Sequence, residues 1–230
     1  MEEIIYSPVW FYGKDIIIDA IGVVILSLIG ATTLKYYRLS RDRKYLFFAS
    51  SFFAIALSFL AKMLGNLKVY SLLSATRQQG ALVFQYHVTE ASAMLILFSF
   101  LFYRILLLFG WYGLYLLYHK GHNKADIIVM AFFLFVITFL TSAWFFLFHL
   151  TLLLLIGLVV WTLARNCKKT RSGTAKLLPV SFLILALGHV MFLFIGSARQ
   201  FYVIGEVIQL IGYFLLLLAF ILVLRHGKKT

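Results

Sequence analysis

Apolar segments of about 20 residues alternate with short polar segments along almost the whole chain. A helix needs about 20 predominantly apolar residues to cross the hydrocarbon core of a bilayer. We therefore predict an all-α bundle of seven transmembrane helices, forming one transmembrane domain over residues 1–230. The expected spans are 15–37, 45–64, 81–104, 125–142, 145–165, 177–196 and 201–224.

The third apolar segment is too long for a single ordinary crossing. It runs through residue 118, and 38 residues in one helix would extend about 57 Å at ~1.5 Å per residue. Two short spans would move every later loop to the opposite side. We therefore expect one span that ends near an interfacial Arg104, whose side chain reaches the headgroups. Residues 105–118 then form either an interfacial extension or part of a long third helix, and the aromatic segment Gly110–Gly113 predicts a bend near the headgroups.

Lysine and arginine are distributed unequally between the two sides of this arrangement. One side carries 15 of the 21 basic residues, and Arg104 belongs to the third span. The other, outer side carries 5, namely Lys14, Lys62, Lys68, Arg77 and Arg199. Basic residues accumulate in cytoplasmic loops. We therefore expect the N-terminus outside and the C-terminus in the cytoplasm. The acidic Glu2 and Glu3 are unlike the start of a cleaved signal peptide, so we expect the first span to be retained.

The composition excludes most soluble classes. Hydrophobic residues make up 63% of the chain and charged residues 13%, against about 45–50% and 25% in soluble domains. This excludes a soluble enzyme, a disordered tail and a nucleic-acid-binding domain, and the single Cys167 excludes a disulfide scaffold. The net charge of +13 then reflects topology and contact with anionic lipids. We expect a multi-pass protein of the plasma membrane, whose partners are the lipid bilayer and other membrane subunits.

Ionisable side chains within the predicted spans share one depth, about 7–14 Å below the outer helix ends at ~1.5 Å per residue. Such residues inside a membrane are functional-site candidates by default, because a charge costs about 2.5–3.5 kcal/mol there even on lenient scales. We predict that five of them, from four spans, converge in one cavity in the outer half. They are His87, Glu90, His149, His189 and Glu206.

Three imidazoles and two carboxylates form a donor set that suits zinc or non-haem iron. Glu90 or Glu206 could then act as general base on a metal-bound water. We expect Asp19, Tyr202 and Gln209 to support the ligands from a second layer. Two alternatives stay open: a hydrogen-bonded network without a metal, and a haem b held between two of the histidines.

Seven spans with an external N-terminus resemble the layout of microbial rhodopsins and G-protein-coupled receptors. The likeness is limited to layout. Residues 201–224 contain no lysine for a retinal Schiff base, and the Asp-Arg-Tyr and Asn-Pro-x-x-Tyr motifs of receptors are missing. The His-x-x-x-His pair of seven-span zinc hydrolases is also missing. Two function classes remain: a metal-dependent membrane hydrolase or redox protein, and a non-catalytic module that serves as a sensor, a transporter fragment or a subunit of a larger complex.

Overall fold

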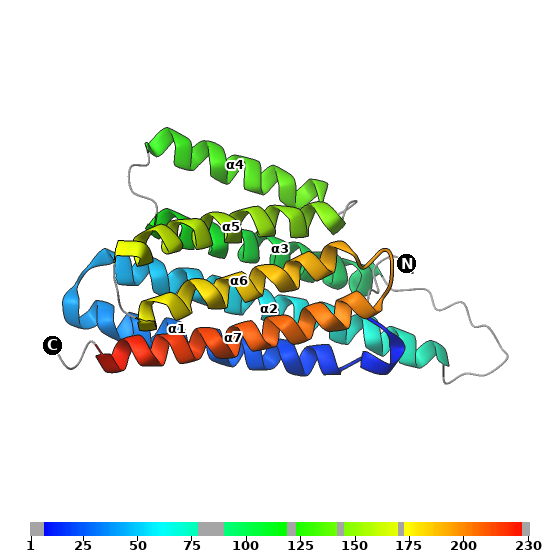
Figure 1. Cartoon of the computed structure of the whole chain (residues 1–230). Coiled ribbons are helices and arrows are strands. Elements are labelled where there is room, and N and C mark those ends of the chain that lie inside the picture. The colour runs from blue at the N-terminus through cyan, green and yellow to red at the C-terminus, as the bar shows by residue number, and fades with distance from the viewer. Residues whose placement is uncertain (1–6, 78–89, 119–122, 142–144, 170–172, 227–230) are drawn as a thin grey trace.

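The computed structural model describes residues 7–77, 90–118, 123–141, 145–169 and 173–226. Within these ranges a short 3₁₀ helix at Val9–Phe11 precedes seven α-helices, and no strand is present. The all-helical prediction is therefore confirmed. The helices are α1 (Lys14–Ser40), α2 (Arg43–Arg77), α3 (Glu90–Tyr118), α4 (Lys124–Leu140), α5 (Phe145–Lys169), α6 (Gly173–Leu193) and α7 (Gln200–His226) (Figure 1).

Six of the described helices are long and apolar enough to cross a membrane, namely α1, α2, α3, α5, α6 and α7. The apolar part of α4, Ile127–Leu140, is shorter than the roughly 20 residues that a crossing needs. The structure thus supports a multi-pass protein in a lipid bilayer. The seven-span count and the orientation of the termini stay predictions.

The six long helices form a closed ring. Neighbours around it follow the order α1, α2, α3, α5, α6 and α7, and α7 packs back against α1. Helix α4 lies outside the ring against α3 and α5 (Figure 1). Successive helices run in alternating directions, so α1 begins at one end of the bundle and α7 finishes at the other (Figure 1). The ring therefore encloses an interior to which the first and last helices contribute side by side.

Helix α2 continues beyond the predicted end of the second span. We expected that span to stop at residue 64 and a polar loop to follow, but the helix runs to Arg77. Lys62, Asn66 and Tyr70 are spaced four residues apart, so they share one face of the helix. Lys62 and Asn66 on that face are buried. Polar residues that we assigned to the outer surface therefore line the interior of the bundle.

Helix α3 is continuous from Glu90 to Tyr118, and the start of the predicted third span lies outside the described residues. Residues 105–118 are helical, as predicted, but they belong to the same candidate span, Ala91–Tyr118. The half-buried Arg104 therefore lies near the middle of this candidate span and not at its end, where we predicted it.

The glycines of α3 serve close packing against α2. A Cβ added at Gly110 would lie 2.5 Å from Cγ1 of Ile55, and one at Gly113 would lie 2.4 Å from Oγ of Ser51. Small residues at such positions let membrane helices approach closely. The two glycines thus permit a tight contact between α2 and α3, and the helix continues through both of them.

The remaining boundaries agree with the predicted spans to within four residues. Helix α6 begins at Gly173, four residues before the predicted span, so Pro179 lies inside the helix.

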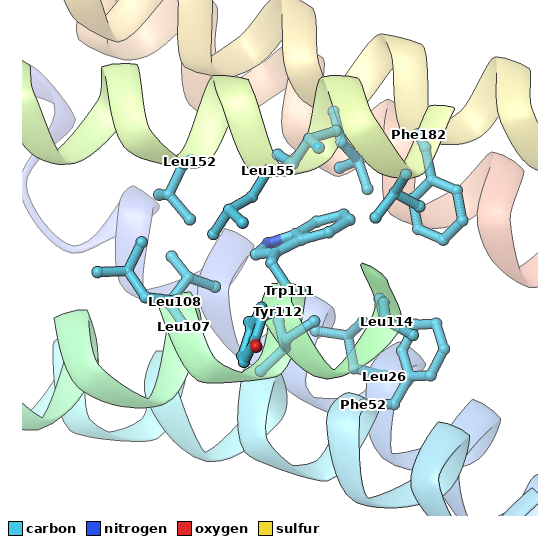
Figure 2. Packing of buried hydrophobic residues seen from close by; sticks show 14 of the residues in the cluster. Leu26, Phe52, Leu107, Leu108, Trp111, Tyr112, Leu114, Leu152, Leu155 and Phe182 are labelled. Atoms are coloured by element: carbon cyan, nitrogen blue, oxygen red, sulfur yellow. The ribbon is translucent and has the colours of Figure 1, made fainter. Parts of the chain in front are cut away.

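Trp111, from the segment that we expected near the headgroups, is buried in the apolar core. It is 2% exposed, and its ring meets that of Phe182 edge to face at 5.4 Å between centroids. Figure 2 shows its indole between Leu155 of α5 and Phe182 of α6. The core cluster draws side chains from the helices of the ring and fills much of the interior.

We predict that Trp111→Ala lowers the free energy of unfolding by about 3–5 kcal/mol, because a large buried aromatic leaves a cavity when truncated. The control is Trp161→Ala on α5, whose side chain is 61% exposed and should tolerate truncation. Thermal unfolding of the detergent-solubilised variants measures both losses. Similar losses in the two variants would contradict the central position of Trp111.

Candidate functional site

A lysine of α2 is bound to carboxylates from two other helices inside the bundle. Nζ of Lys62 donates to Oδ1 of Asp19 on α1 at 3.0 Å and to Oε1 of Glu206 on α7 at 2.7 Å. The side chains of Asp19 and Glu206 are 2% and 1% exposed. These are charge-assisted hydrogen bonds of ordinary length. We refer to Asp19, Lys62 and Glu206 as the ion triad.

Three aromatic rings surround the ammonium group of Lys62. Their centroids lie 5.9 Å (Phe59), 6.0 Å (Tyr103) and 5.9 Å (Tyr202) from Nζ. A cation within about 6 Å of a ring centroid is attracted by the ring quadrupole. The ammonium is therefore held both by carboxylates and by an aromatic cage from α2, α3 and α7.

Lys62 neutralises only part of the negative charge of the ion triad and donates to only some of its carboxylate oxygens. It contains two carboxylates and one ammonium. Oδ2 of Asp19 and Oε2 of Glu206 have no hydrogen-bond partner in the described part of the chain. A buried polar atom without a partner carries a desolvation cost of about 1–3 kcal/mol, and more when it is charged. The triad would therefore gain from an additional donor or positive charge.

Asp15, one helical turn before Asp19, is well satisfied. It is the second residue of α1, where the positive end of the helix dipole favours a carboxylate. Its carboxylate accepts hydrogen bonds from α1, α2 and α7. The donors are the backbone N–H of Ile16 (2.9 Å), Nδ2 of Asn66 (3.3 Å), and the hydroxyls of Tyr202 (3.3 Å) and Tyr70.

Two histidines form a second buried network beside α7. Nδ1 of His149 on α5 lies 3.1 Å from Nδ1 of His189 on α6. A hydrogen bond between two ring nitrogens needs one N–H and one lone pair, so the two rings share a single proton at this contact. Nε2 of His189 lies 3.2 Å from Nε2 of Gln209. Nε2 of His149 has no partner among the described residues.

Glycines bring α6 and α7 close enough for this contact. A Cβ added at Gly188 would lie 2.7 Å from Cγ of Gln209 and 3.2 Å from the carbonyl oxygen of Gly205. A Cβ added at Gly205 would lie 2.5 Å from the ring of Phe192. A side chain at Gly188 would displace Gln209, and one at Gly205 would displace the ring of Phe192, so both positions suit glycine.

The predicted cavity residues that the structure describes fall into these two networks. His149 and His189 contact each other, whereas Glu206 is bound to Lys62. Glu206 and Gln209 are three residues apart on α7 and so share one face. His87 and the side chain of Glu90 lie outside the described residues.

The three predicted supporting residues are divided in the same way. Gln209 contacts His189. Asp19 belongs to the ion triad, and Tyr202 donates to Asp15 while its ring faces Lys62.

Metal binding finds no support in this geometry. Among the described residues no group of three or more His, Cys, Asp or Glu is arranged to hold a metal ion. The ammonium of Lys62 lies between the two carboxylates, and three of the four imidazole nitrogens of the histidine pair have partners. A zinc or iron site therefore stays a prediction that depends on His87 and Glu90.

The haem alternative does not fit His149 and His189. Haem iron held by two histidines has one ring on each face of the porphyrin. The direct contact between the two rings leaves no space for a porphyrin between them.

Lys62, Asn66, Tyr70 and Asp15 are site residues that sequence reasoning did not identify. Lys62 was counted with the outer-side charges that determined the topology. A signal was present, because polar residues at 62, 66 and 70 and carboxylates at 15 and 19 recur every four residues. On antiparallel neighbouring helices, these two stripes can face each other.

Comparison with protein-family models gives no match. Comparisons with curated proteins and with solved structures give no significant match. The function is therefore inferred from the site itself.

We predict that Lys62→Met lowers the free energy of unfolding by about 3–5 kcal/mol, because removing one partner leaves buried charge uncompensated. The half-buried Lys68 lies on the same helix, and Lys68→Met should cost less than about 1 kcal/mol. Adding Asp19→Asn and Glu206→Gln to Lys62→Met should recover most of the loss, since no charge then lacks its partner. Thermal unfolding compares the variants, and a triple variant as unstable as Lys62→Met would contradict the role of charge.

Proposed function

We propose that this protein is a membrane-embedded sensor that responds through the ion triad. In this proposal it crosses the membrane seven times, with the N-terminus outside and the triad in the outer half. The observation that carries the proposal is that Lys62, inside the bundle, is bound to carboxylates of two other helices. A stimulus that changes these ion pairs would alter the packing of α1, α2 and α7 and signal to a membrane partner.

The energetics of the triad favour a functional role. Ionisable groups within membrane helices are costly and typically mark pathways, relays or ligand sites. Buried ion pairs are weak evidence for stability, since apolar replacements of similar size are often neutral or stabilising. The two carboxylate oxygens without described partners add to that cost. A charge-based switch explains why such an arrangement is useful.

The apolar core favours a sensor over a channel or transporter. Pores and transport pathways are lined by groups that replace the hydration shell of the substrate. In this bundle large apolar side chains with almost no exposure fill the interior of the ring, among them Trp111, Phe52 and Phe182. A polar site near one end and a close-packed remainder suit a change of helix packing better than passage of an ion.

The triad can exist in two arrangements that differ in helix contacts. With both carboxylates charged, Lys62 ties α2 to α1 and to α7. If one carboxylate is neutralised or bound by another cation, Lys62 is left with a single strong partner. A stimulus shifts such an equilibrium only to the extent that it binds one arrangement more tightly. The excess acceptors of the triad provide that difference.

We predict that reporter fusions after Gly121 and at the C-terminus both report a cytoplasmic location, and that one near Leu72 reports an external location. The reasons are the 15-to-5 distribution of basic residues and the alternating direction of successive helices, including α4 (Figure 1). If α4 does not cross the membrane, the fusions at Gly121 and at the C-terminus will lie on opposite sides.

We predict that Glu206→Gln, which mimics a neutralised carboxylate, shifts the distances between α1 and α5 at the end far from the triad. Spin labels at the exposed positions Leu39 and Trp161 report these distances in lipid nanodiscs. The control Arg199→Gln removes an exposed charge just before α7 and should leave the distances unchanged. Identical distributions in all three proteins would refute the sensor. A steady cation flux in proteoliposomes would instead indicate a transporter.

A further inference from the structure

We propose that the ion triad and its aromatic cage form a binding site for a primary alkylammonium cation, which Lys62 occupies as a tethered substitute. This inference rests on the proposed sensor function for its physiological meaning, because the incoming cation would be the stimulus that displaces Lys62. The chemistry of the site itself can be tested independently of that function.

The groups around Nζ of Lys62 are those that recognise an ammonium ion. Two carboxylate oxygens accept its hydrogen bonds at 3.0 and 2.7 Å. Three aromatic rings surround it at 5.9–6.0 Å. Aromatic faces attract ammonium groups and ligand cations at about this distance. None of these groups depends on the cation being attached to α2.

The site retains capacity for a further cation. The charge of Lys62 balances one of the two carboxylates. Oδ2 of Asp19 and Oε2 of Glu206 are buried and have no described partner. A second ammonium could take these two oxygens, or it could replace Lys62 entirely. The first route gives the carboxylates donors that they lack, and the second removes the link from α2 to α1 and α7.

The observations favour an ammonium over a metal ion. Calcium and magnesium require six or more oxygen ligands, whereas this site has two acceptor atoms without partners in the described ranges. Aromatic rings supply no ligand atoms to such metals, but their faces attract an ammonium group. Two of the three donors of a primary ammonium can also bind the two carboxylates at once, as those of Lys62 do.

The site is close to one end of the bundle. Asp19 is the sixth residue of α1, about 8 Å along the helix axis at ~1.5 Å per residue. A primary ammonium could therefore reach it as a free amine or as the ethanolamine headgroup of a phospholipid. The two sources present the same chemical group, and the choice of lipid separates them.

The site chemistry is tested by chemical rescue of Lys62→Ala. Propylammonium replaces the part of the lysine side chain beyond Cβ, and it should raise the thermal unfolding midpoint of this variant in a saturable manner. At 100 times Kd, one-site linkage corresponds to about a 100-fold shift of the folding equilibrium. Propanol, which is neutral and of similar size, should have no such effect. The matched variant Lys68→Ala, whose site still holds Lys62, should show a clearly smaller rise of its unfolding midpoint with propylammonium.

Adding Glu206→Gln to Lys62→Ala should raise the Kd for propylammonium at least about tenfold, because one charge-assisted hydrogen bond is lost. No rescue of folded Lys62→Ala, or equal rescue by propanol, would overturn the ammonium site.

Competition between propylammonium and Lys62 is tested on the spin-labelled chain that retains Lys62. This experiment therefore does not depend on whether Lys62→Ala folds. In phosphatidylcholine nanodiscs, propylammonium should shift the Leu39–Trp161 distances in the same direction as Glu206→Gln does. A shift on adding phosphatidylethanolamine alone would identify the lipid headgroup as the source. If neither propylammonium nor phosphatidylethanolamine shifts the distances, the proposed displacement of Lys62 is wrong. If propylammonium rescues Lys62→Ala but Glu206→Gln leaves the spin-label distances unchanged, the ammonium site is supported and the sensor function is refuted.

Discussion

The neutralisation of one ammonium group inside an apolar bundle is the constraint on which the rest of the polar architecture depends. Lys62 can be buried only where counter-charges reach it, and the ring supplies them from α1 and α7. This requirement fixes how three helices face each other. It also accounts for the position of Asp15, whose hydrogen bonds from Asn66, Tyr70 and Tyr202 join the same three helices one turn nearer the end of the bundle.

The two halves of the interior are held by different forces. Near the start of α1 and α7, charge-assisted hydrogen bonds join the helices. Further along, close packing around Trp111 and the glycine contacts of α3 take over, since helices in lipid gain little from the hydrophobic effect and rely on shape. Helix α7 takes part in both buried networks, because Glu206 binds the triad and Gln209 contacts the histidine pair.

The sequence predicted the helices well because span length and hydropathy are local properties. It identified His149, His189, Glu206 and Gln209 as interior residues for the same reason. It did not identify Lys62, because a lysine near the end of an apolar segment is usually interpreted as a surface charge. Its burial becomes evident only from the neighbouring helices. The exact pairings were also out of reach, since they depend on the neighbour order α1–α2 and α1–α7, which hydropathy does not encode. Gly110 and Gly113 show the same ambiguity, because a glycine within a helix can indicate either a bend or a close contact with a neighbouring helix.

The separation of the triad along the chain has a consequence for biosynthesis. Asp19 lies 43 residues before Lys62, whereas Glu206 lies 144 residues after it. At a synthesis rate of about 5–20 residues per second, Glu206 emerges roughly 7–30 s after Lys62. During that interval Asp19 is the only member of the triad that can accompany the lysine into the membrane. The α1–α2 hairpin can thus enter the bilayer with its charge already paired, and α7 joins a pair that exists before the ring closes.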